Sequence, residues 1–308
     1  MQHCVQEELP RFIEPMLASA GPAPTTADWA MEVKWDGARA QLRFDGRTVC
    51  VRSRPGRDCT GEFPELLAIA GALGTRTAVL DGELVCFGAD GKPDFGALRS
   101  RLGAGQQRRC AVQRGPAVKV MLFDLLHVDG FAVRRLGYEC RRETLAELEL
   151  EGPAWSTPRH FVGEGERLLC VTAEHGLEGV VAKRLDSRYA EGRRSGAWRK
   201  HKHRRRERLV VTGWRERDGM LPEFLLARRR PERRLIPAGS ASLGLDGEHR
   251  AQLLEALAQH AISSRGRRGS VRWVSPVIDV LVDVHGPADG AVRDAIIREI
   301  CPPQALGR

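Results

Sequence analysis

Lysine is scarce in this sequence. Only six of the 49 basic residues are lysine, and arginine supplies all the others. Because arginine provides the general positive charge, a retained lysine indicates a need for a compact amine, or for one that can lose its proton and act as a nucleophile. This reasoning singles out four lysines for inspection: Lys34, Lys183, Lys200 and Lys202.

Several familiar motifs are absent. The eight cysteines are scattered and form no Cys-x-x-Cys pair, which argues against a disulfide framework and a structural zinc site. No apolar run approaches the roughly 18 residues of a membrane span. The segment Met1–Glu8 lacks the features of a secretory signal, so we expect no membrane association and a cytoplasmic location. A Gly-x-x-x-x-Gly-Lys-Ser/Thr motif is also missing, which disfavours a P-loop kinase or ATPase.

The charge balance favours a polyanionic partner. The formal net charge is +9 and the isoelectric point is near 9.5, as is typical of nucleic-acid-binding proteins. A solvated basic surface in an arginine-rich proteome would give the same values, and composition alone does not separate the two explanations. The length of 308 residues suits two domains.

The hydrophobic pattern of the first two thirds predicts a domain of α+β type with antiparallel sheets and flanking helices. Alternating residues and the turn Asp45-Gly46 predict a β-hairpin over 29–54. Further strands are expected at 79–85, 118–126, 178–184 and 198–202, and helices at 62–73, 138–149 and 165–175.

The composition changes at His203–Arg208, a charged segment that we expect to separate two domains, residues 1–204 and 205–308. Beyond it, five short strand-like segments and one helix with Leu253, Leu254 and Leu257 on its apolar face suit an OB-fold β-barrel.

Two arginine runs lie in the second part, at 228–234 and 265–268. They are either loops that bind a nucleic-acid backbone or solvated surface, and the sequence favours neither explanation.

The segment around Lys34 carries a distinct local pattern. On a strand, Glu32, Lys34 and Asp36 would share one face, which describes a salt-bridge ladder as well as an amine held for reaction. Taken alone, the ladder is the simpler explanation. Gly37 would allow a backbone or a ligand to approach closely.

Other clusters follow in order along the chain. Glu83 comes just past a turn, Phe123 ends a predicted buried strand, and Glu178 shares a predicted strand with Lys183. Lys200 and Lys202 share one face of the next strand. Two amines there repel each other unless an anion lies between them, and a triphosphate would be such an anion.

Together these motifs resemble the ATP-dependent DNA ligases, within the lysine-dependent nucleotidyltransferases that include RNA ligases and mRNA capping enzymes. Over residues 10–215 their order and spacing are close to those of bacterial end-joining ligase domains. The resemblance implies ATP and Mg²⁺ or Mn²⁺ as cofactors and nicked or broken duplex DNA as substrate. It further implies a monomer that acts near the nucleoid with a Ku-type end-binding protein and a repair polymerase.

The resemblance also assigns roles to residues. Lys34 would be the nucleophile that takes AMP, Glu178 and Glu83 would bind the metal ion, and Phe123 would stack on adenine. Contacts with the nucleotide and with phosphates would come from Glu32, Asp36, Arg39, Arg54, Glu83, Phe123, Lys183, Lys200 and Lys202.

The C-terminus departs from the family pattern. Cys301 and Gln304 stand where the Arg and Lys of an Arg-x-Asp-Lys element are expected, so adenylation with free ATP should be slow. Two other functions therefore stay open: an RNA ligase or capping-type nucleotidyltransferase, and a nucleic-acid-binding protein that has lost catalysis.

Overall fold

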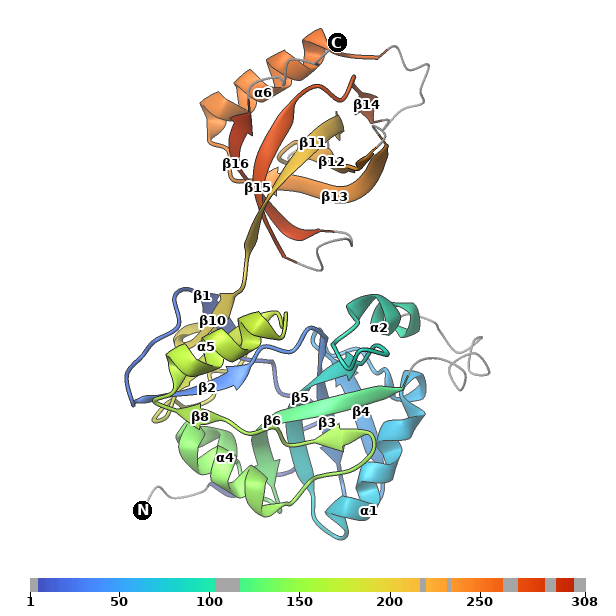
Figure 1. The fold of residues 1–308 in the computed structure, drawn as a ribbon. Coiled ribbons are helices and arrows are strands. Elements are labelled where there is room, and N and C mark those ends of the chain that lie inside the picture. The colour runs from blue at the N-terminus through green and yellow to red at the C-terminus, as the bar shows by residue number, and fades with distance from the viewer. Residues whose placement is uncertain are drawn as a thin grey trace. The chain divides into compact units, whose positions relative to one another are not determined.

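The computed structural model describes residues 5–102, 117–216, 220–231, 234–262, 271–285 and 292–301. The chain divides into two compact units, Met1–Lys202 and His203–Arg308, which are described separately below. Figure 1 shows both units and labels most of their helices and strands.

One sheet of the first unit brings together strands from both ends of that unit. Its central strand is β9, which contributes the apolar positions Val180 and Ala182 to a small core with Met31 of the neighbouring β2. In order across the sheet, its strands are β1 (Leu17–Ala20), β10 (Arg194–Lys202), β9 (Gly179–Arg184), β2 (Trp29–Val33) and β8 (Phe161–Val162).

The other sheet of the first unit carries its largest core. The hairpin predicted over 29–54 is formed by β3 and β4 alone, because residues 29–33 form β2 of the first sheet. The long apolar run forms a buried strand, β6. In order, its strands are β4 (Val49–Ser53), β3 (Ala38–Phe44), β5 (Ala78–Cys86), β6 (Val118–Val128) and β7 (Trp155–Ser156).

The prediction of purely antiparallel sheets is wrong at two edges. β1 runs parallel to β10, and β7 runs parallel to β6. Both edge strands reach their partners through long connections, whereas only antiparallel strands can be joined by a tight hairpin turn. The sheets are therefore mixed.

Helices cover the sheets of the first unit at several places. α4 packs on β6, α2 on β5, and α5 on β2 and β9. The helix expected at 62–73 is only partly α-helical: Pro64–Ala68 form the 3₁₀ helix η2, and the last five residues form an α-helix. The helical elements are η1 (Thr60–Glu62), η2 (Pro64–Ala68), α1 (Ile69–Leu73), α2 (Phe95–Arg101), η4 (Val133–Arg135), α4 (Tyr138–Glu147) and α5 (Gly165–Glu174).

In the second unit, strand pairing closes into a ring. Successive neighbours are β12, β13, β16, β15 and β11, and β11 pairs back onto β12, while β14 adds to β11. A core with Val211, Phe224 and Val282 packs against Leu253 and Leu257 of the helix. The elements are β11 (Arg205–Arg215), β12 (Glu223–Arg229), β13 (Leu235–Leu243), α6 (Gly247–Gln259), β14 (Arg272–Trp273), β15 (Asp279–His285) and β16 (Arg293–Cys301).

The arginine-rich segments of this unit are more ordered than the sequence indicated. Arg205 to Arg208 belong to β11. Arg228 and Arg229 belong to β12, where Arg228 is buried and pairs with Glu207, and Arg229 Nη2 lies 3.1 Å from the Asp279 carboxylate. These two arginines are therefore strand residues with carboxylate partners. The run 265–268 lies outside the described residues.

Within the described ranges, no helix is long and apolar enough to cross a bilayer. The six cysteines in those ranges are all free thiols, one of them being Cys301.

Candidate active site

Lys34 lies where the chain passes from one sheet of the first unit to the other. β2 ends at Val33 and β3 begins at Ala38, so Lys34 and Asp36 are loop residues and not members of a strand face. The Lys34 amide still donates to the Gly179 carbonyl at 2.9 Å, which extends the pairing with the strand before the chain turns away.

Gly37 explains how this crossing can be so tight. A Cβ atom added at Gly37 would lie 2.1 Å from the Leu84 carbonyl oxygen and 2.9 Å from Glu83 Cγ. Only glycine therefore allows the loop to lie directly on β5. The same contact places Lys34 and Glu83 at one cavity.

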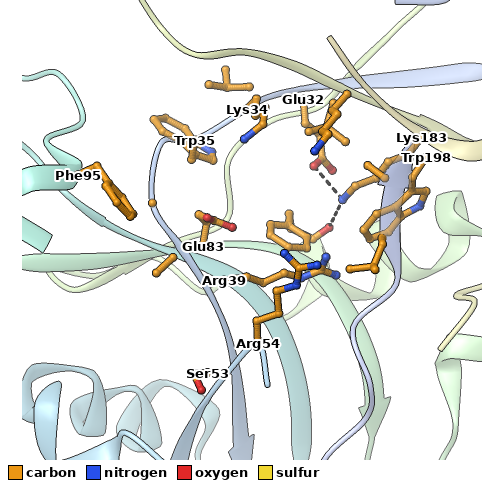
Figure 2. A pocket seen from close by; sticks show the side chains of 18 of the residues that line it. Glu32, Lys34, Trp35, Arg39, Ser53, Arg54, Glu83, Phe95, Lys183 and Trp198 are labelled. Atoms are coloured by element: carbon orange, nitrogen blue, oxygen red, sulfur yellow. Dashed lines mark hydrogen bonds and ion pairs between the residues drawn. The ribbon is translucent and has the colours of Figure 1, made fainter. Parts of the chain in front are cut away.

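The cavity has a volume of about 460 Å³, within the usual range for small-molecule sites. Figure 2 shows Glu32, Lys183 and Trp198 at one end, Trp35 and Phe95 at the other, and Lys34 between them. Its lining includes eight of the residues proposed from sequence: Glu32, Lys34, Arg39, Arg54, Glu83, Phe123, Lys183 and Lys200. Asp36, Glu178 and Lys202 are not part of this lining. Glu178 contacts Lys34, which lines the cavity, and Lys202 contacts Glu178.

Glu178 links two of the singled-out lysines. Its Oε2 lies 2.6 Å from Lys34 Nζ and its Oε1 lies 2.9 Å from Lys202 Nζ. Burial alone would raise the pKa of Glu178, but the two ammonium groups lower it below its ordinary value. Glu178 thus bridges Lys34 and Lys202, whereas an anion between Lys200 and Lys202 stays a prediction. Glu178 lies just before β9 instead of within it.

Glu32 and Lys183 form a buried pair at one end of the cavity. Lys183 Nζ lies 2.8 Å from Glu32 Oε2 and donates to the Phe123 carbonyl at 3.3 Å. The ammonium also lies 4.3 Å from the ring centroids of Phe123 and Trp198, a cation–π arrangement. Burial lowers the pKa of Lys183, and the Glu32 carboxylate opposes that effect. Lys183 is therefore part of the cavity wall.

Arg39 is held by a second buried network. Its guanidinium makes two hydrogen bonds to the Asp81 carboxylate, at 3.0 and 2.6 Å, and donates to the Tyr189 hydroxyl at 3.0 Å. Although burial opposes its charge, Asp81 raises the pKa of Arg39 above its ordinary value. The side chain contributes its flank to the cavity, with its charge already balanced.

A tight turn presents Arg54 at the cavity rim. Gly56 N donates to the Ser53 carbonyl at 2.8 Å, and Gly56 adopts a φ of +84°, which favours glycine. Arg52 Nη1 donates to the Gly56 carbonyl at 2.9 Å and fastens the turn. Arg54 itself is exposed, as a residue that meets an external phosphate would be.

Glu83 faces the cavity from β5. Burial raises the pKa of its carboxyl group to about 7, and Lys34 and Arg39 lower it only in part. Within the described residues, no group of three or more His, Cys, Asp or Glu side chains is arranged to hold a metal ion by itself.

The site also contains residues that sequence reasoning did not select. Trp35, Phe95 and Val181 line the cavity, and the Tyr138 hydroxyl donates to Glu32 Oε1. Trp35 follows the nucleophile candidate directly, which is the one signal that could have identified it. Phe123, expected at a strand end, lies in the middle of β6.

Of the C-terminal element, only one position is described. Cys301 is buried at the end of β16, and its backbone pairs with Asp279. Gln304 lies outside the described residues.

Residues 15–202 match the family described as "ATP dependent DNA ligase domain". The multifunctional non-homologous end joining DNA repair protein LigD of Mycobacterium tuberculosis is 38% identical over 209 residues, covering 67% of this chain and 26% of that protein. The chain thus spans about a quarter of the length of that relative.

Two solved ligase structures are also similar to this chain. The ligase domain of M. tuberculosis LigD matches with a TM-score of 0.58 and 32% identity, over 94% of this chain and 95% of that one. A mycobacterial DNA ligase D complexed with ATP and MES matches with the same TM-score, identity and coverage of both chains.

Proposed function

The chain belongs to the ATP-dependent DNA ligases, and from this premise we propose that it joins broken or nicked duplex DNA through an AMP-lysine intermediate on Lys34. The membership confirms the resemblance carried by the motifs. The observation that supports the proposal most directly is the Lys34 amine, which projects into a nucleotide-sized cavity beside Glu178.

The reaction would proceed in three displacements at phosphorus. Lys34 Nζ attacks the α-phosphorus of ATP, the bond to the bridging oxygen breaks, and pyrophosphate leaves with the electron pair. The 5′-phosphate of DNA then displaces the lysine and receives AMP. A 3′-hydroxyl finally attacks that 5′-phosphate and releases AMP. Before the first step, the amine must leave Glu178 and lose its proton.

We place the base of ATP at the end of the cavity lined by Phe123, Val181 and Glu32. The apolar side chains suit a purine ring, and Phe123 would stack on it. The Glu32 carboxylate can only accept hydrogen bonds. It therefore suits the 6-amino group of adenine and would repel the 6-oxygen of guanine, which argues for ATP over GTP.

The remaining assignments are also proposals. Arg54, which is exposed at the rim, would grip the 5′-phosphate of DNA, and Lys200 would face the phosphates of ATP. Lys202 would act through its contact with Glu178. A phosphate role for Lys183 stays a prediction, since its contacts favour support of Glu32. Contacts of Asp36 and Arg39 with the ribose also stay predictions.

Mg²⁺ or Mn²⁺ would be held by Glu178 and Glu83 together with the phosphates that enter with ATP. Two carboxylates fit that mode, because Mg²⁺ commonly takes one or two carboxylates and completes its shell with phosphates and water. Bound there, the ion would neutralise developing charge on the phosphates. As the nucleotide arrives, Glu178 would release Lys34 and Lys202 and contact the ion instead.

We assign residues 1–204 to an adenylation domain and residues 205–308 to an OB-fold barrel. The closed ring of five paired strands with α6 supports a small barrel. A role in bacterial end-joining repair, in the cytoplasm and with a Ku-type protein and a repair polymerase, is proposed by analogy with the relatives.

The test uses ATP labelled on the α-phosphate. Purified protein with Mg²⁺ or Mn²⁺ should carry the label through a denaturing gel, and nicked DNA should discharge it. Lys34→Ala should abolish the label, whereas Lys92→Ala, the loss of an exposed loop lysine, should preserve it. Labelling by GTP, or discharge only by RNA, would replace the proposal with the capping or RNA-ligase alternative.

If the protein takes no label, releases no ATP with pyrophosphate and still binds nicks, the ligase proposal fails and a binding-only function takes its place.

A further inference from the structure

We propose that Tyr138 is a positioning residue of the nucleotide site, which holds the Glu32 carboxylate where it accepts a hydrogen bond from the 6-amino group of adenine. The inference rests on the proposed function and adds the residue that sets the base preference. The chain contains only two tyrosines, and sequence reasoning selected neither.

The two oxygens of Glu32 have different partners. The Tyr138 hydroxyl donates to Oε1, and Lys183 Nζ lies 2.8 Å from Oε2. Tyr138 is fully buried and Glu32 is 8% exposed, so the hydroxyl has no contact with bulk water and the carboxylate has little. A carboxylate restrained at both oxygens cannot rotate, and its remaining lone pairs keep fixed directions toward the cavity that Glu32 lines.

Tyr138 owes its place to a clamp one turn further along α4. Arg141 binds the Asp124 carboxylate with two hydrogen bonds, at 2.7 and 3.0 Å, and both side chains have no solvent exposure. The same guanidinium donates to the carbonyls of Leu136 and Ser187 at 2.8 Å. Since Asp124 adjoins Phe123 on β6, this clamp fixes the start of α4 relative to the proposed base-stacking ring.

The hydroxyl is well suited to this task. Burial, and next the Glu32 carboxylate, raise the pKa of Tyr138 well above its ordinary value, so the phenol keeps its proton and acts as a donor. Without it, Lys183 would be the remaining partner among these contacts, and Glu32 could turn toward the ammonium and away from the ligand. A hydrogen bond to a charged group is among the stronger ones, so its loss should be measurable.

The experiment compares two nucleotides that differ only at position 6. ATP carries the amino group, and purine riboside triphosphate lacks it. Lysyl-AMP formation, and its purine counterpart, are measured in single turnovers with wild type and Tyr138→Phe, which gives the apparent Kd and the maximal rate. Tyr189→Phe is the matched control, because Tyr189 is the other buried tyrosine and donates to a different carboxylate, Asp81, at 2.6 Å.

In wild type, loss of the amino group should weaken binding by about tenfold or more. In Tyr138→Phe, we expect ATP to bind about tenfold more weakly, with the preference for ATP over the purine analogue reduced by a similar factor and the maximal rate retained. Tyr189→Phe should keep the wild-type preference. A general loss of stability would not produce this selective coupling between one hydroxyl and one amino group.

An unchanged preference for ATP in Tyr138→Phe overturns the inference. It leaves the ligase proposal intact, because that proposal depends only on whether wild type forms the adduct. If Tyr138→Phe does not fold, wild type grown with 3-fluorotyrosine provides two fluorine resonances, assigned with Tyr189→Phe. The Tyr138 resonance should then differ between the ATP-derived and purine-derived adducts, and identical resonances overturn the inference.

Discussion

Around the cavity of the first unit, ion pairs join residues that are far apart in the sequence, and their carboxylates are nearly inaccessible to water. Lys34 and Glu178 are 144 residues apart, and the Glu178 side chain is 5% exposed. The second unit also has a buried pair, Arg228 with Glu207. On its strand surface, by contrast, Asp283 joins Arg206 and Arg298 of its two neighbouring strands. These two arginine side chains are 61% and 46% exposed.

The difference separates two uses of charge. Burying an ion pair costs desolvation energy that the pair seldom recovers, so buried pairs at a cavity indicate chemistry and not stabilisation. Exposed pairs between neighbouring strands contribute little to stability. Four substitutions test the difference between the cavity of the first unit and the strand surface of the second.

The largest effect should come from Lys34→Arg. The substitution keeps the positive charge near Glu178 but replaces the amine by a guanidinium that does not deprotonate at neutral pH. We expect adduct formation to fall at least about 10³-fold, as when a nucleophile is removed from other enzymes. Arg206→Ala should retain the adduct. A measurable adduct on Lys34→Arg would show that the buried pair holds no nucleophile.

Gly37→Ala should come next. Its Cβ would lie 2.1 Å from a backbone oxygen of β5, which must shift. We expect a loss of about 3 kcal/mol in the free energy of unfolding of the first unit, measured by urea denaturation. Gly247→Ala at the start of α6 is the counterpart in the second unit, because its Cβ meets nothing within 4 Å. Equal losses in the two variants would contradict the account of the crossing loop.

The third effect concerns pH. The pKa of Glu83 is about 7 in the folded protein and near 4.5 in an unfolded chain. The folded state therefore binds the proton more tightly, and stability from this group is full below pH 4.5 and declines as pH rises through 7. Glu83→Gln should be more stable than wild type by about 2 kcal/mol at pH 8, and show no such gain at pH 5.

Denaturant unfolding at the two pH values measures this difference. An equal effect of Glu83→Gln at pH 5 and pH 8 would show that the carboxyl group titrates normally.

The smallest effect should come from Arg206→Ala. The Arg206 side chain is largely exposed, and its Nε lies 3.2 Å from the Asp283 carboxylate. We expect a loss below about 0.5 kcal/mol, which disappears in 1 M salt. A larger, salt-independent loss in thermal unfolding would mean that the second unit also depends on its ion pairs.

Local patterns predicted much of the fold. The turn of the hairpin of β3 and β4, the strand β6 and the helices α4 and α5 lie close to the predicted ranges, because alternation and helical spacing depend on near neighbours. The predicted apolar Leu253 and Leu257 of α6 lie in the core. The parallel edges β1 and β7 were missed because their pairing is decided by residues far away in the chain. The 3₁₀ character before α1 was missed because apolar spacing does not distinguish it from an α-helix.

For the site too, the sequence predicted which residues gather but not which of them pair. Motif order brought Lys34, Glu83, Phe123 and Lys200 to one cavity without any knowledge of the contacts. It could not show that Lys183 pairs with Glu32, or that the Glu178 carboxylate lies between the amines of Lys34 and Lys202. Tyr138 carried no signal at all, because a single tyrosine at the start of a helix is most often a core residue.

The contacts that join Lys34, Glu178 and Lys202 have a consequence for synthesis. Lys34 meets Glu178 and Lys202 only after some 170 further residues have been translated, which at 5–20 residues per second takes on the order of ten seconds or more. During that interval, the nascent chain carries the amine without the carboxylate beside it. A ribosome-stalled fragment that ends before β9 should therefore be unable to accept AMP, so that adenylation reports completion of the first unit.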